Sequence, residues 1–226
     1  MATLTFIGHA TVEVRSGDTS ILIDPFISDN PVATHSVDDF QPDAILLTHG
    51  HFDHIPDAVP LAKRHNCPIV APVELASYCE TQGAPETVGM NTGGVTTFDF
   101  GTVMFTPAFH SSSHDGHYLG QPCGILLTTN EGQTIYHAGD TALFSDMKLI
   151  GEEGIDVALL PIGSHFTMDP KAAARAVEFI EPRYVVPIHY NTFPPIEQDA
   201  EAFKRDVEGR TSAHVIVLAP GDTHEF

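Results

Sequence analysis

The sequence contains the stretch Thr48-His49-Gly50-His51-Phe52-Asp53-His54, in which four side chains that can bind a metal ion fall within six residues. An α-helix would spread these four side chains around its axis, and a regular strand would turn His54 away from the other three. A tight loop lets all four converge, and Gly50 gives such a loop backbone freedom. Imidazoles and a carboxylate suit zinc, iron or manganese, so the stretch predicts a metal site; a chance cluster of solvated histidines is the alternative.

The residues on either side of this stretch anchor it. Asp43-Ala44-Ile45-Leu46-Leu47 is a short apolar run that suits a buried strand. Ile55-Pro56-Asp57 opens a helix predicted over residues 57–66, since proline is tolerated in the first turn. The candidate ligands are therefore expected on a loop that follows the carboxyl end of a strand.

Three later strands are also predicted to end in side chains that can bind a metal. The strands at 102–107, 133–137 and 184–189 lead to His110, Asp140 and His189. Separated residues can converge where strands end along one edge of a rigid scaffold. One such residue would be unremarkable, but four strand ends in one chain predict a single shared site.

The remaining elements follow from apolar periodicity and turn residues. We expect further strands at 3–7, 11–15, 19–24, 68–71, 95–100, 123–129, 155–161 and 214–218. Further helices are expected at 73–82 and 196–208, with another that Asp169 caps and Pro182 ends.

Composition narrows the class of protein. Acidic residues number 30 against 10 basic ones, so the formal net charge is −20, and such a surface repels nucleic acids and anionic membranes. No apolar run is long enough for a membrane span, and the start has no signal-peptide pattern. We therefore expect a cytoplasmic protein whose three cysteines, Cys67, Cys79 and Cys123, are reduced.

The pattern Thr-His-x-His-x-Asp-His after a strand resembles the metal-binding signature of the metallo-β-lactamase superfamily. The resemblance can be followed over nearly the whole chain. It implies an α/β fold of the α+β kind, a four-layer αββα sandwich of two ββ-α halves, with residues 1–226 as a single domain. It also implies that the metal site lies along one edge of the sandwich.

Carried over residue by residue, the resemblance implies two divalent metal ions, with zinc favoured and manganese or iron as alternatives. One ion would be held by His49, His51 and His110, the other by Asp53, His54 and His189, and Asp140 would bridge the two. Asp24, at the end of the strand 19–24, matches an aspartate that supports the metal loop in the superfamily; an ordinary turn residue is the alternative.

This ligand set implies a metal-dependent hydrolase in which Asp53 and Asp140 serve catalysis. Two neighbouring cations lower the pKa of a shared water, so hydroxide becomes available near neutral pH. No serine or cysteine nucleophile is then needed. Within the superfamily the chain is similar to a small group of hydrolases resembling bacterial ascorbate-6-phosphate lactonases, on motifs such as His137-Ala138-Gly139-Asp140-Thr141 and Pro187-Ile188-His189-Tyr190-Asn191.

One departure from that group stands beside the predicted site. Ser164-His165 occupies the position where the group is expected to have Asp-Asn. His165 is therefore a candidate general acid or substrate contact, and a solvated or capping histidine is the alternative.

The expected substrate is a small ester-like molecule, with a lactone favoured and a small phosphodiester left open. No nucleic-acid or membrane partner is expected, and a homo-oligomer is left open. Two rival activities share the core motif. Mononuclear iron chemistry of the persulfide dioxygenase type would not need the ligands for a second ion. A ribonuclease-like phosphodiesterase would predict a basic arm or an accessory domain, and the sequence has neither.

Overall fold

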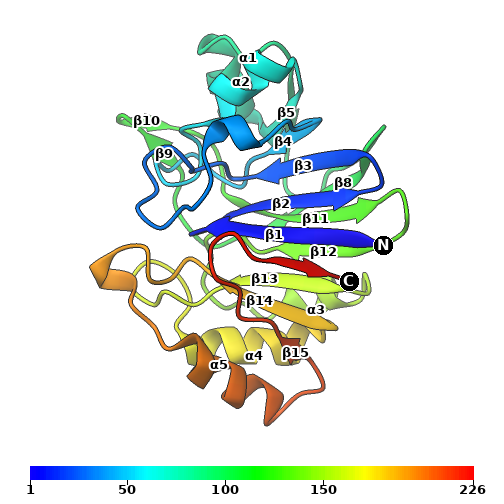
Figure 1. Ribbon diagram of the computed structural model, residues 1–226, viewed down its shortest axis with the longest axis vertical. Coiled ribbons are helices and arrows are strands. Elements are labelled where there is room, and N and C mark those ends of the chain that lie inside the picture. The colour runs from blue at the N-terminus through cyan, green and yellow to red at the C-terminus, as the bar shows by residue number, and fades with distance from the viewer.

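A computed structural model describes residues 1–226, and two seven-stranded β-sheets form its centre (Figure 1). The first sheet has, in spatial order, β16 (Thr223–Glu225), β1 (Ala2–Gly8), β2 (Thr11–Ser16), β3 (Thr19–Ile23), β4 (Ala44–Leu46), β5 (Ile69–Pro72) and β6 (Thr87–Met90). The second has β15 (His214–Val215), β14 (Tyr184–Ile188), β13 (Val157–Pro161), β12 (Thr134–His137), β11 (Cys123–Thr129), β8 (Gly101–Pro107) and β7 (Val95–Phe98). A separate hairpin pairs β9 (Ser113–His114) with β10 (His117–Tyr118).

Helices cover the two outer faces. They are α1 (Ala58–His65), α2 (Val73–Thr81), α3 (Met147–Gly151), α4 (Pro170–Ile180) and α5 (Ala200–Glu208), with short 3-10 helices η1 (Val37–Asp39) and η2 (Pro194–Ile196). In Figure 1, α1 and α2 lie at one end of the molecule and α4 and α5 at the other. None of the five α-helices is long and apolar enough to cross a membrane.

Alternation along the strands separates the layers. On β3, Ile21 and Ile23 belong to the core between the sheets, whereas Leu22 packs with α1 and α2. On β13, Leu159 faces the core between the sheets and Leu160 packs with α4 and α5. Successive side chains of a strand point to opposite faces, and here both faces are buried. The four-layer αββα sandwich predicted from the sequence is therefore confirmed.

Strand direction places the loops that matter at one edge. In the first sheet β3, β4 and β5 are parallel, and β1 runs the same way because β2 is antiparallel to both β1 and β3. In the second sheet β12, β13 and β14 are parallel, and β8 shares their direction through antiparallel β11. The carboxyl ends of β1, β3 and β4 therefore lie together, as do those of β8, β12 and β14.

The structure departs from the predicted elements mainly near the C-terminus. The helix expected over 196–208 begins only at Ala200, because Asp199 caps it by accepting a hydrogen bond from the Ala202 amide, after the 3-10 turn of Pro194–Ile196. The strand expected over 214–218 ends at Val215. Strands β6 and β16 and helix α3 were not predicted. The three cysteines are free and buried.

Candidate metal centre

The seven predicted ligands come together at this edge of the sandwich. Their side chains form two groups whose ligand atoms lie within 4.8 Å of one another: His49, His51, His110 and Asp140 in one, and Asp53, His54 and His189 together with His9 in the other. The two groups correspond to the two predicted ligand sets, with one added histidine. Residues from both halves of the chain therefore meet in one place.

Asp140 lies between the two groups. Its Oδ2 is 3.4 Å from His110 Nε2 and 3.1 Å from His189 Nε2, and its Oδ1 is 3.6 Å from His54 Nε2. Burial alone would raise the pKa of Asp140, but His189 and His54 outweigh burial and hold it well below its usual range. Asp140 is therefore an ionised carboxylate that faces both groups, which is the position that a bridging ligand needs.

Three buried polar atoms of the candidate ligands have no hydrogen-bond partner, namely His54 Nε2, Asp140 Oδ1 and His189 Nδ1. The first two face each other at 3.6 Å. A buried polar atom without a partner costs about 1–3 kcal/mol. A cation between them would satisfy the lone pairs of both atoms. The residues present therefore fit a divalent metal ion.

Asp24 holds the metal loop from below. Its Oδ1 accepts a hydrogen bond from the Thr48 amide at 2.8 Å, and its Oδ2 accepts bonds from the Thr48 hydroxyl at 2.5 Å and from His54 Nδ1 at 2.8 Å. Although burial lowers the pKa of His54, the carboxylates of Asp140 and Asp24 raise it well above its usual value. Because Nδ1 donates to Asp24, a cation bound at Nε2 would replace the proton that this raised pKa favours there. The expectation that Asp24 supports this loop is confirmed.

The same hydroxyl orients His49. Thr48 donates its single proton to Asp24, so the 3.0 Å contact with His49 Nδ1 has the imidazole as donor. His49 Nε2 then carries a lone pair and lies 3.0 Å from His51 Nδ1. Burial is the main cause that lowers the pKa of His49, and it also lowers those of His51 and His110. These rings are therefore neutral near pH 7, the form that binds metals.

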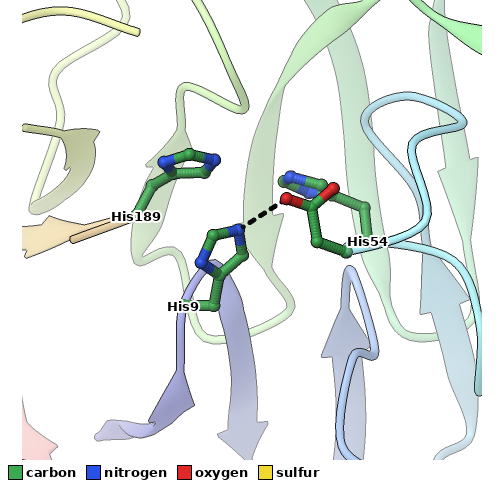
Figure 2. Close-up of side chains that lie close together, drawn as sticks. His9, His54 and His189 are labelled. Atoms are coloured by element: carbon green, nitrogen blue, oxygen red, sulfur yellow. Dashed lines mark hydrogen bonds and ion pairs between the residues drawn. The ribbon is translucent and has the colours of Figure 1, made fainter. Parts of the chain in front are cut away.

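His9 was missed by the sequence analysis. Its buried ring lies between the two halves: Nε2 is 3.2 Å from Asp53 Oδ2, Nδ1 is 2.9 Å from the Thr192 hydroxyl, and the ring centroid is 4.1 Å from that of His189. Figure 2 shows His9 beside His189, with a dashed contact toward a carboxylate next to His54. Burial is the main cause that lowers the pKa of His9 to about 4. The neutral ring therefore donates to Asp53 and accepts from Thr192.

A signal for His9 existed in the sequence. His9 follows the end of β1 directly, as Asp24 follows the end of β3. Both have left-handed backbone conformations, with φ of 59° and 47°, and His189 after β14 has a φ of 54°. Non-glycine residues adopt this conformation only at a cost, and it is enriched at functional sites. Extending the search for residues at strand ends to the first hairpin would have found His9.

The structure does not bring His165 into this group. Its side chain is exposed, and its ring packs edge-on against Phe166, with centroids 4.5 Å apart. Phe166 lines the metal-site cavity and His165 does not. His114 and His117 lie in the β9–β10 hairpin, and neither belongs to a ligand group or lines this cavity. The catalytic role of His165 stays a prediction.

A cavity of about 520 Å³ opens over the ligands. It is lined by His51, Phe52, Asp53, His110, Ser111, Asp140, Phe166, His189, Phe193 and Pro195. Its volume is in the range of small-molecule sites. Five of these ten residues are candidate ligands, so a molecule in the cavity would contact the metal centre directly.

If the ligands hold metal, removing it should lower thermal stability. A metal present at about a hundred times its Kd stabilises the folded state by about 2.7 kcal/mol. In a chain of this size that corresponds to a fall in Tm of about 5–10 °C after dialysis against a chelator. Differential scanning calorimetry before and after chelation, and after zinc is returned, measures this. A Tm unaffected by chelation, in protein that elemental analysis shows to have lost its metal, would contradict a metal bound by the folded state.

Comparison with known proteins gives consistent matches. The family model described as Beta-lactamase superfamily domain matches residues 19–190. A UPF0173 metal-dependent hydrolase of Geobacillus thermodenitrificans is 56% identical over 206 residues, covering 88% of this chain and 90% of the relative. A protein of the same description from Thermus thermophilus is 50% identical over 224 residues, covering 98% of each chain.

Solved structures agree on the fold. A metallo hydrolase from the archaeon Ignicoccus hospitalis has a TM-score of 0.91 and 39% identity, covering 100% of this chain and 99% of the other. An isothiocyanate hydrolase from Delia radicum gut bacteria has a TM-score of 0.80 at 23% identity, covering 99% and 98%. The second likeness bears on the fold alone.

Proposed function

This chain belongs to the metallo-β-lactamase superfamily and is a metal-dependent hydrolase, and from that premise we propose that it uses two divalent metal ions to hydrolyse a small ester-like substrate. Zinc is the favoured metal, with manganese or iron as alternatives. A lactone is the favoured substrate, on the strength of the sequence resemblance, and a small phosphodiester is the second candidate. The proposed ligands are His49, His51, His110, Asp53, His54, His189 and the bridging Asp140.

The observation that carries this proposal is the unpartnered pair of His54 Nε2 and Asp140 Oδ1. The pair lies where the two ligand groups meet, and each group offers enough donors for an ion of its own. A single-ion site would leave one group of buried imidazoles and carboxylates without a role. The two-ion reading is therefore favoured over mononuclear iron chemistry.

When bound, two such ions lower the pKa of a shared water and polarise the electrophilic centre of the substrate. The chain's own residues supply the arrangement. Asp140 is held ionised between the groups, and Asp24 and Thr48 set the tautomers of His54 and His49. His9 donates to Asp53 Oδ2, which leaves Oδ1 as the free oxygen for an ion. Phe52, Phe166 and Phe193 line the cavity over the ligands.

The two-ion proposal predicts close to two equivalents of transition metal per chain. Elemental analysis of protein purified without added metal, and again after zinc is supplied, measures this. The loaded protein should then turn over members of a panel of lactones and small phosphodiesters and leave structured RNA intact. A stoichiometry that stays at one under full metal supply would contradict the two-ion site. Efficient RNA cleavage without turnover of any small ester would contradict the substrate class.

His165 carries a separate prediction. If its imidazole donates a proton to the leaving group, His165→Ala should lower kcat and remove one limb of the pH–rate profile. His117→Ala is a matched control, because His117 is also an exposed histidine and lies in the β9–β10 hairpin. An unchanged profile in His165→Ala would refute the acid role, and a change in KM alone would assign His165 to substrate binding.

A further inference from the structure

The walls of the metal-site cavity differ sharply from its floor. The floor consists of the candidate ligands, and the remaining lining residues are Phe52, Ser111, Phe166, Phe193 and Pro195. Four of these five side chains are apolar, and the only other polar group is the Ser111 hydroxyl. None of the ten lysines and arginines lines this cavity or the hollow that adjoins it at His110 and Ser111. The walls therefore offer an apolar surface without a positive charge.

The aromatic side chains are placed to receive a ligand. Phe52 and Phe193 come from the loops after β4 and β14 and lie with their ring centroids 6.3 Å apart. Both also contact buried Phe26, at 6.3 Å and 6.4 Å, which supports them from beneath. Phe52 remains 60% exposed and Phe166, from the loop after β13, remains 55% exposed. Large apolar side chains that stay this exposed around a small-molecule cavity mark a binding surface.

From these walls we infer that the substrate is an uncharged molecule whose electrophilic carbonyl carries an apolar tail, seated against Phe52, Phe166 and Phe193. This inference rests on the proposed hydrolysis at the same site. An anionic group on the tail would have to leave water for an apolar wall, and no lysine or arginine lines that wall to compensate it. The chain's net charge of −20 acts against an anionic ligand from outside as well. A phosphorylated lactone, which the sequence resemblance would allow, is disfavoured by these walls.

Binding can be measured without turnover by calorimetry on the zinc-loaded protein. The probes are acetohydroxamate, hexanohydroxamate and adipic monohydroxamate, which share a metal-binding head. Adipic monohydroxamate has the chain length of hexanohydroxamate but ends in a carboxylate. Each tail methylene that becomes buried should tighten Kd by up to about fourfold. Hexanohydroxamate should therefore bind at least about tenfold more tightly than either of the other two.

Two wall variants locate the effect. Phe52→Ser and Phe166→Ser change exposed side chains and should each reduce the ratio of the acetohydroxamate Kd to the hexanohydroxamate Kd by about threefold to tenfold. Leu149→Ser is the matched control, because Leu149 is an apolar residue that is 60% exposed, as Phe52 is, and lies outside this cavity and the adjoining hollow. It should leave the ratio unchanged. Metal content of each variant confirms that the site is intact.

The outcomes separate this inference from the proposed function. Affinity that is independent of the tail, or equal for the carboxylate-ended probe, would overturn the inference even if lactones are hydrolysed. If binding depends on the tail, and Phe52→Ser and Phe166→Ser weaken that dependence, the inference is supported even if no lactone is turned over. In that case only the proposed reaction is refuted. A ratio that changes equally in Leu149→Ser would also overturn the assignment to these walls.

Discussion

Asp140→Asn should lower turnover by more than about a hundredfold, since even residues that only support a metal ligand contribute about 10- to 100-fold. The substitution keeps the volume of the side chain and removes the charge that faces His49, His54, His110 and His189. An asparagine offers one oxygen instead of two and cannot bridge two cations as a carboxylate does. Both ions should therefore be weakened together.

Elemental analysis and steady-state kinetics on the same preparation test this expectation. Metal content should fall toward zero or one equivalent, and added zinc should restore it only at higher concentrations than in the unmodified protein. Circular dichroism shows whether the variant is folded. Near-normal turnover together with normal metal content in Asp140→Asn would show that Asp140 does not bridge.

Asp24→Asn is expected to damage stability and metal binding at once. Asp24 Oδ2 accepts hydrogen bonds from the Thr48 hydroxyl and from His54 Nδ1. An amide nitrogen at that position is itself a donor, so it could accept neither bond. Leaving these buried donors unsatisfied should lower the free energy of unfolding by roughly 2–5 kcal/mol. Because His54 also loses the partner that sets its tautomer, metal affinity should fall about 10- to 100-fold.

Asp57→Asn is the matched control for that prediction. Asp57 is another buried carboxylate with three donors, which are the Ile27 amide, the Ser28 amide and the Ser28 hydroxyl, but it is not among the candidate ligands or their partners. It should lose comparable stability in urea unfolding and keep its metal affinity. If Asp24→Asn kept its metal affinity while losing stability in the same way as Asp57→Asn, Asp24 would be a purely structural residue.

The net charge of −20 makes overall stability depend on salt, which matters for the unfolding measurements on Asp24→Asn and Asp57→Asn. Exposed carboxylates repel one another, and salt screens this repulsion over about 8–10 Å near physiological ionic strength. Asp24 and Asp57 are each buried, so salt screens their hydrogen bonds much less than it screens the repulsion between exposed carboxylates. The stability differences expected for their variants should therefore persist when salt is raised.

Much of this protein was decided by local patterns that the sequence displays directly. A strand buried on both faces is a run of apolar residues, so β3, β11 and β13 could be predicted to within two residues at each end. The metal loop is recognisable because its donors fall within six residues, and His110, Asp140 and His189 are recognisable because each follows such a strand. The resemblance that these residues carry then implied the four layers.

Other features depended on which distant segments the sheets bring together. His9 and Thr192 are 183 positions apart, and their contact exists only because the carboxyl ends of β1 and β14 lie at one edge of the packed sheets. Strand β16 forms because β1 at the other end of the chain offers it a partner. The exposure of His165 and the apolar walls around the ligands also depend on how distant loops meet at this edge. Propensity and periodicity act over a few neighbouring residues, whereas these contacts are set by strand order and sheet packing, which only the tertiary structure specifies.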